Sequence, residues 1–150
     1  MLTDALLAWL HYQAIFLLIV ALTVEAFLLR PDIQSPAISR LLNYDRIYLA
    51  SAILVVITGG LHLAFGVKEL AFYMSNPWFY TKIAVFIAIG LCSIPPTFFS
   101  ELKKTAKLHP GLLPDNAAIK RARRWIMLEA HLIILLPLFT ALIARCGFVA

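Results

Sequence analysis

The stretch ALLAWLHYQAIFLLIVALTVEAFLL, residues 5–29, carries a single charged side chain, Glu25. A helix that crosses a bilayer needs about 20 mostly apolar residues, so this stretch is long enough to do so. Three further stretches of the same kind follow at residues 47–65, 78–99 and 125–146. The sequence therefore predicts an all-α fold: one domain over residues 1–150, built as an integral-membrane bundle of four transmembrane helices.

The composition of the whole chain agrees with this prediction. It is 62% hydrophobic and 14% charged, whereas soluble domains are about 25% charged. This balance argues against a soluble globular protein, a disordered chain and a nucleic-acid binder. The two cysteines, Cys92 and Cys146, lie in separate apolar stretches and do not form a CxxC pair. Neither a disulfide framework nor a zinc site is therefore expected.

The positions of Lys and Arg predict the orientation of the chain in the membrane. Ten of these residues lie in the connections after the first and third predicted spans, and two lie on the other side. Lys and Arg are enriched in cytoplasmic loops. The prediction is a multi-pass protein of the bacterial inner membrane with both termini facing outward. Its immediate surroundings are membrane lipids.

Ionisable side chains at membrane depth are the first place to look for a function, because each charged one costs roughly 2.5–3.5 kcal/mol to insert. The predicted spans contain six of them: His11, Glu25, His62, Lys82, Glu129 and His131. With a rise of 1.5 Å per residue, three of them lie roughly 9 Å outward of the midpoints of their spans: His11, His62 and Lys82. The other three lie about 7–12 Å inward, and Arg46 marks the cytoplasmic mouth.

Helical spacing predicts which of these side chains face the interior. His11 and Glu25 are two heptads apart, on one face of the first span. Residues spaced by four and three form a stripe on the second span: Tyr44, Tyr48, Ser51, Val55, Thr58 and His62. Glu129 and His131 are two residues apart, so they cannot share a face.

Each of these side chains also has a plain structural interpretation. His131 can be a packing residue, and Lys82 can extend to the outer headgroups. Such interpretations leave unexplained why three nitrogen-bearing side chains from separate helices share one level. Imidazoles in a helix bundle suit the axial ligation of haem iron, and a neutral lysine can also be a ligand. Two other functions are possible for these side chains. One is binding of a transition metal, and the other is a proton relay through Glu25, Glu129 and His131.

Four segments resemble a family of uncharacterised bacterial four-span inner-membrane proteins, and together they extend over nearly the whole chain. They read WLHYQAIFLL, TGGLHLAFG, NPWFYTKIAVFIAIGLCSIPPT and LEAHLIILLPL. More distantly, the chain is similar to the HemJ-type protoporphyrinogen IX oxidases, which are small haem b proteins of the membrane. The corresponding positions are His11, Arg46 with Tyr48, Lys82 and Glu129, while Tyr80 stands where that family commonly has His.

The HemJ resemblance implies haem b as the cofactor, with His11 and Lys82 tied to ligation and activity. It also implies a redox function, either the oxidation of a tetrapyrrole or electron transfer to or from quinone. We expect His11 as one axial ligand and Lys82 or His62 as the other. Glu25, Glu129 and Arg46 are then expected to handle protons or substrate carboxylates.

Two other hypotheses remain open at this stage. The first is a binding or transport protein without haem, in which the same side chains hold a metal ion or a small molecule. The second is a structural membrane subunit whose polar groups only fix helix packing. A homo-oligomer with the porphyrin between two chains is a further arrangement that the sequence allows.

Overall fold

The computed structural model describes residues 2–30, 33, 35–66, 70–93 and 115–145, and all of its regular elements are helices. They are α1 (Leu2–Leu28), α2 (Ser35–Phe65), α3 (Leu70–Met74), α4 (Pro77–Cys92) and α6 (Asn116–Arg145). The all-α prediction is therefore confirmed for the described part of the chain.

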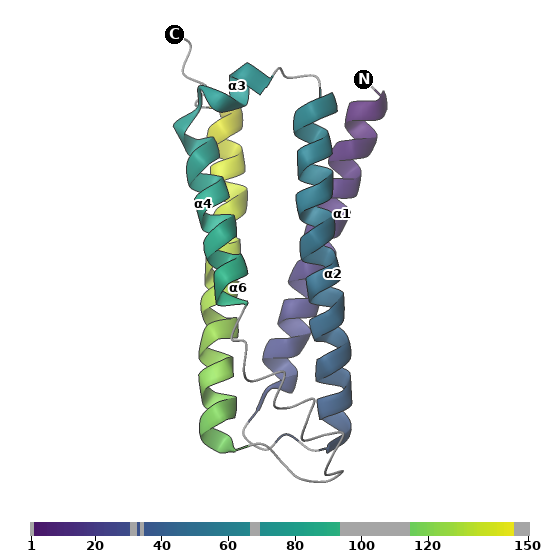
Figure 1. Ribbon diagram of the computed structural model, residues 1–150, viewed down its shortest axis with the longest axis vertical. Helices are drawn as coiled ribbons and strands as arrows, with labels where there is room; N and C mark the ends of the chain where they lie inside the picture. Colours follow the sequence, from purple (N-terminus) through teal and green to yellow (C-terminus); the bar gives the residue numbers. More distant parts are fainter. Residues whose placement is uncertain (1, 31–32, 34, 67–69, 94–114, 146–150) are drawn as a thin grey trace.

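The four long helices form two antiparallel hairpins (Figure 1). The most extensive contacts are those of α1 with α2 and of α4 with α6. Between the hairpins, contact runs mainly along α1 and α6. The remaining pair of facing helices, α2 and α4, is thus held apart. The start of α1 and the end of α6 lie at the same end of the bundle, as up-and-down topology requires.

Local sequence signals explain where the helices begin. The Asn76 side chain accepts a hydrogen bond of 3.0 Å from the Trp78 backbone N–H, and Pro77 occupies the first turn of α4. This is the expected N-cap followed by proline. The backbone N–H of Ile119 bonds to the Asp115 carbonyl, which sets the start of α6 beside Asp115. The short helix α3 ends two residues before the Asn76 N-cap.

Three of the described helices are long and apolar enough to cross a membrane: α1, residues 37–65 of α2, and α6. The fourth, α4, is apolar but shorter, with 16 residues. At 1.5 Å per residue it covers about 24 Å of a hydrocarbon core about 30 Å thick. The predicted third span continued to residue 99, and residues 94–99 lie outside the described part.

The connection after the first span is shorter than predicted. Arg40 and Arg46 were expected in a loop, but both lie on α2, which begins at Ser35. At 31 residues, α2 is about 46 Å long, so it extends well beyond the hydrocarbon thickness. The hydropathy pattern marks where the apolar environment ends, whereas the helix continues for three more turns.

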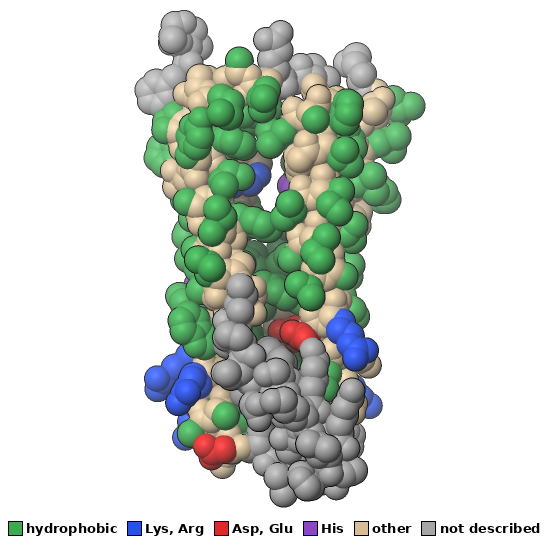
Figure 2. Space-filling model, viewed as in Figure 1, with side chains coloured by type: hydrophobic (Ala, Val, Ile, Leu, Met, Phe, Trp, Pro, Cys, Tyr) green, Lys and Arg blue, Asp and Glu red, His purple; other side chains and the backbone are tan. Residues whose placement is uncertain are grey.

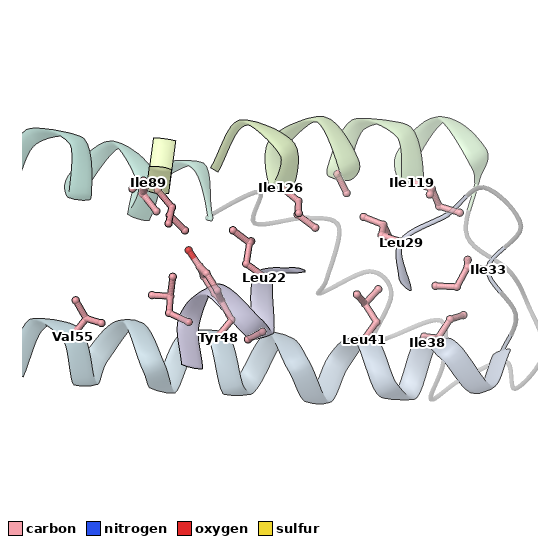
Figure 3. Packing of buried hydrophobic residues seen from close by; sticks show 14 of the residues in the cluster. Leu22, Leu29, Ile33, Ile38, Leu41, Tyr48, Val55, Ile89, Ile119 and Ile126 are labelled. Atoms are coloured by element: carbon pink, nitrogen blue, oxygen red, sulfur yellow. The ribbon is translucent and has the colours of Figure 1, made fainter. Parts of the chain in front are cut away.

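The hydrophobic core follows the seams between the helices (Figure 3). Leu29, Leu41 and Ile119 pack together at one end, and Tyr48 extends from α2 toward Ile89 of α4. Ala21 and Ser51 are completely buried, which fits the close helix approach that small residues allow in membranes. The outward faces carry large apolar side chains, as lipid contact requires.

Enlarging one buried small residue should loosen the bundle. We expect Ala21→Leu to reduce the free energy of unfolding by about 1–3 kcal/mol, because the tightly packed seam has no room for the added atoms. Val20→Leu is the matched control, since Val20 is 54% exposed. Unfolding of the purified protein in mixed micelles measures both. Equal stability of the two variants would contradict the packing described here.

Candidate functional site

His11 lies in the first polar cluster, between α1 and α2. Its Nδ1 is 3.0 Å from the Thr58 Oγ1. The Thr58 hydroxyl has one hydrogen, and it donates this to the Leu54 carbonyl at 2.6 Å. Thr58 Oγ1 must therefore accept from His11, which makes Nδ1 the protonated nitrogen. Nε2 is then the basic nitrogen of the ring, available for ligation.

Gly59 allows the His11 ring to lie directly against α2. A Cβ atom at this position would be 3.2 Å from His11 Cε1, which is tighter than most contacts of real Cβ atoms. Thr58 thus sets the tautomer of the ring and Gly59 provides its space. A hydrogen bond that fixes ring orientation in this way is typical of metal-ligating histidines.

The other two predicted ligands lie near His11 but on different hairpins. Lys82 and His62 both interact electrostatically with His11. His62 belongs to α2, and its buried Nδ1 makes no hydrogen bond; the Asp4 Oδ1 is 3.7 Å away. Lys82 belongs to α4, on the opposite hairpin. His62 and Lys82 thus both lie within electrostatic range of His11.

A gap separates the two hairpins next to this cluster. Figure 2 shows it as a hollow in the surface, with a cationic side chain and a His ring visible inside. Further along the bundle, a cavity of about 170 Å³ lies between the same hairpins. Its walls are mostly apolar: Leu18, Tyr48, Ala52, Ile53, Val56, Phe86, Ile89, Gly90 and Ser93.

The second polar cluster contains the two membrane carboxyl groups. Glu25 on α1 is 3% exposed and Glu129 on α6 is 2% exposed, and the two interact electrostatically. The Tyr48 side chain on α2 lies near Glu129 and Ser93. Because Tyr48 also lines the cavity, it connects the carboxyl groups to the space between the hairpins.

Two predicted candidates lie apart from these clusters. His131 is exposed on the outer face of α6, where its Nδ1 donates to the Met127 carbonyl at 2.5 Å. Glu129 is therefore the member of its pair that faces the interior. Arg46 is exposed on α2, two residues before Tyr48, so it belongs to the surface near the carboxyl cluster.

Some partners in these clusters were not singled out from the sequence. Thr58 and Tyr48 were placed on the interior stripe of the second span, but their links to His11 and Glu129 were not foreseen. Asp4, which lies opposite His62, was also missed. The only signal for it is an acidic residue in the first turn of an otherwise apolar helix, where a carboxylate also suits the helix dipole.

These features define a class: a multi-pass, all-helical membrane protein with two polar clusters enclosed between helical hairpins. The family model described as "Predicted membrane protein (DUF2214)" matches residues 3–147, so the chain belongs to that family. This agrees with the resemblance to an uncharacterised membrane family. No curated protein matches the chain, and no solved structure does.

The geometry predicts one tautomer for His11. In protein labelled with ¹⁵N-histidine, NMR should show the His11 ring with its proton on Nδ1. Thr58→Val removes the acceptor at nearly the same volume, so the fixed tautomer should give way to a mixture. Thr23→Val is the control, because Thr23 bonds to the carbonyl of Ile19 within α1. A proton on Nε2 in the wild-type protein would contradict the assignment.

Proposed function

We propose that this protein binds haem b between its two hairpins and works as a membrane redox protein. The observation that carries the proposal is the arrangement at His11. Its basic nitrogen is set by Thr58, its ring lies on Gly59, and Lys82 comes from the facing hairpin. Two nitrogen ligands from opposite sides would suit the two faces of a haem group.

The donor set fits haem better than a bare metal ion. In the described residues there is no group of three His, Cys, Asp or Glu side chains that could hold a metal ion. A zinc or copper site usually needs three or four protein ligands. Haem iron takes its equatorial nitrogens from the porphyrin, so the protein supplies only one or two axial ligands.

Lys82 is a better candidate than His62 for the second ligand, because it lies on the hairpin opposite His11. His11 and His62 both belong to the hairpin of α1 and α2, whereas Lys82 lies on α4. Axial ligands must approach the porphyrin from opposite faces. A porphyrin lying between the hairpins would meet His11 on one face and Lys82 on the other.

The size of the space is consistent with a ligand that lies partly in the open gap. The half-open cavity of about 170 Å³ is smaller than the roughly 300–1,000 Å³ of most ligand pockets. A porphyrin therefore needs the surface gap beside the cavity as well. Gly90 of α4 borders this space without a side chain.

The remaining candidates supply the chemistry around such a group. Haem b, when bound, provides one-electron redox chemistry. Glu25 and Glu129 would then exchange protons, and the exposed Arg46 would attract the carboxylates of an anionic tetrapyrrole. The similarity to the HemJ-type oxidases favours tetrapyrrole oxidation, and quinone-linked electron transfer is the related possibility.

The membrane topology that we propose has four spans, with α4 continuing into the third and both termini outward. The basic residues of the described chain support this orientation. Lys120, Arg121, Arg123 and Arg124 lie on the first turns of α6, at the end where α2 begins. By the positive-inside rule that end is cytoplasmic, in the inner membrane of a bacterium.

A second candidate is a haem-free protein that binds or transports a small molecule or a metal ion. The observation that favours it is the cavity volume. About 170 Å³ is close to the roughly 150 Å³ of a cavity that accommodates benzene. A small apolar ligand would fit without movement of the hairpins, in contact with Tyr48 and Phe86.

The visible absorption spectrum of the purified protein distinguishes the two candidate functions. Protein purified from cells with an ample haem supply should show a Soret band and a reducible b-type spectrum. His11→Ala should remove it, because the ligand is lost. His131→Ala is the matched control and should keep it, since His131 faces outward. A folded but colourless wild-type protein would favour the haem-free candidate, and an unchanged His11→Ala spectrum would refute His11 as a ligand.

The second ligand can be tested in the same way. We expect Lys82→Met to alter or abolish the b-type spectrum, because it removes the nitrogen from the facing hairpin while keeping an unbranched side chain. His62→Ala should retain the spectrum. Absorption and magnetic circular dichroism spectra identify the axial ligands. The reverse result, with haem retained in Lys82→Met and lost in His62→Ala, would establish a bis-histidine site.

A further inference from the structure

The beginning of α6 carries a dense group of positive charges. Four basic residues fall within five consecutive positions of this helix: Lys120, Arg121, Arg123 and Arg124. All four are exposed, and Figure 2 shows Lys and Arg side chains gathered at the end of the bundle where α6 begins. These four residues are called the basic face of α6 below.

The packing of α6 fixes the direction in which the basic face points. Ile119, Ala122 and Ile126 are spaced by three and four residues, and all three are buried. They hold the inner side of the helix against the hydrophobic core, where Ile119 packs with Leu29 (Figure 3). The helix cannot rotate without losing these contacts, so the four positive charges stay on the outer surface.

The basic face lies at the level of the lipid headgroups. The apolar part of α6, which is long enough to cross a membrane, begins at Trp125, directly after Arg124. A bilayer is about 40–45 Å thick with a hydrocarbon core of about 30 Å, which leaves roughly 5–8 Å of headgroup region on each side. From Lys120 to Arg124 the helix rises about 6 Å. All four cations therefore fall within this layer.

Apolar side chains continue from the basic face toward the interior of the bilayer. Trp125, Met127 and Leu128 are exposed. Arg121, Trp125 and Leu128 are four and three residues apart, so they lie along one stripe of the helix surface. The stripe passes from a cation to an indole ring, which is common at the interface, and then to an aliphatic side chain. A phospholipid presents its phosphate, glycerol and acyl chain in the same order.

The spacing of the cations favours an anion between them. Arg121 and Arg124 are three residues apart and Lys120 and Arg124 are four apart, and like charges at these spacings destabilise a helix. Residues 94–114, which lie outside the described part, contain three Lys and one Glu, so their composition adds positive charge. A phosphate group between Arg121 and Arg124 would stabilise both, since a guanidinium group can donate two parallel hydrogen bonds to phosphate oxygens.

The other hairpin does not carry an equivalent surface at this end. Arg30 follows α1, and Arg40 and Arg46 lie on α2, where they are six residues apart and therefore do not share a face. Asp45 stands directly before Arg46 and lowers the local positive charge. The density of charge thus indicates a site on one side of the bundle rather than a ring around it.

We propose that the basic face of α6, together with Trp125 and Leu128, is a binding site for an anionic phospholipid. The phosphate lies at Arg121 and Arg124, and one acyl chain lies along Trp125 and Leu128. A zwitterionic lipid binds less well, because its own cationic group meets the same side chains. The site is on the outer side of α6, so it goes beyond the proposed function and does not depend on haem.

Native mass spectrometry of the full-length protein tests this site. The protein is released from micelles that contain equal amounts of phosphatidylglycerol and phosphatidylcholine. We expect phosphatidylglycerol to be retained preferentially, by roughly fivefold for each cation that contacts the phosphate. Arg121→Gln combined with Arg124→Gln should remove most of this preference. Arg30→Gln combined with Arg40→Gln is the matched control, since it removes two exposed arginines at the same end of the other hairpin. Equal retention of the two lipids by the wild-type protein, or an equal loss in both variants, would overturn the proposal.

Photo-cross-linking of the wild-type protein keeps the test decisive if the α6 variant does not fold. A phosphatidylglycerol analogue with a diazirine near its headgroup should label α6 between residues 120 and 128, and 1 M NaCl should reduce the labelling because salt screens exposed charges. Labelling on α2 alone, or equal labelling by a phosphatidylcholine analogue, would overturn the site. Heparin is the probe for a soluble polyanion. Heparin binding without phosphatidylglycerol labelling would show that the basic face serves a soluble partner, which also contradicts the proposal.

Discussion

Lipid offers no hydrogen bonds, and this constraint accounts for the placement of the polar side chains in the described helices. Polar groups on outer faces bond within their own helix, as Thr23 and His131 do to carbonyls one turn earlier. The carboxyl groups of Glu25 and Glu129 turn inward instead. Because water cannot compensate a polar group at this depth, its partners indicate what the group does.

The two polar clusters occupy different seams of the same bundle. His11 and Lys82 flank the side on which α2 and α4 stand apart, whereas Glu25 and Glu129 lie where α1 and α6 make contact. Tyr48 belongs to both regions, because it lines the cavity and lies near Glu129. A redox group between the hairpins and a proton donor in the adjoining seam would thus share one short polar connection.

Much of this arrangement follows from the sequence, because period and hydropathy act locally. The heptad spacing of His11 and Glu25 and the stripe through Tyr48 and Thr58 predicted their inward faces. Other features depend on contacts between helices that no local pattern records. Neither the choice between Glu129 and His131 nor the Thr58 bond that sets the His11 tautomer could be predicted. The extension of α2 beyond its apolar stretch was missed because hydropathy records the lipid boundary and not the helix end.

The division into two hairpins has a consequence for how the protein is made. Each hairpin has consecutive helices and satisfies its own backbone, so the first can enter the bilayer and fold before the second is synthesised. The gap between α2 and α4 forms only when the second hairpin arrives, with α6 docking along α1. Until then the face bearing His11 is open to the lipid. A flat, lipid-soluble molecule of the kind proposed would then have access to this face from the side during biogenesis.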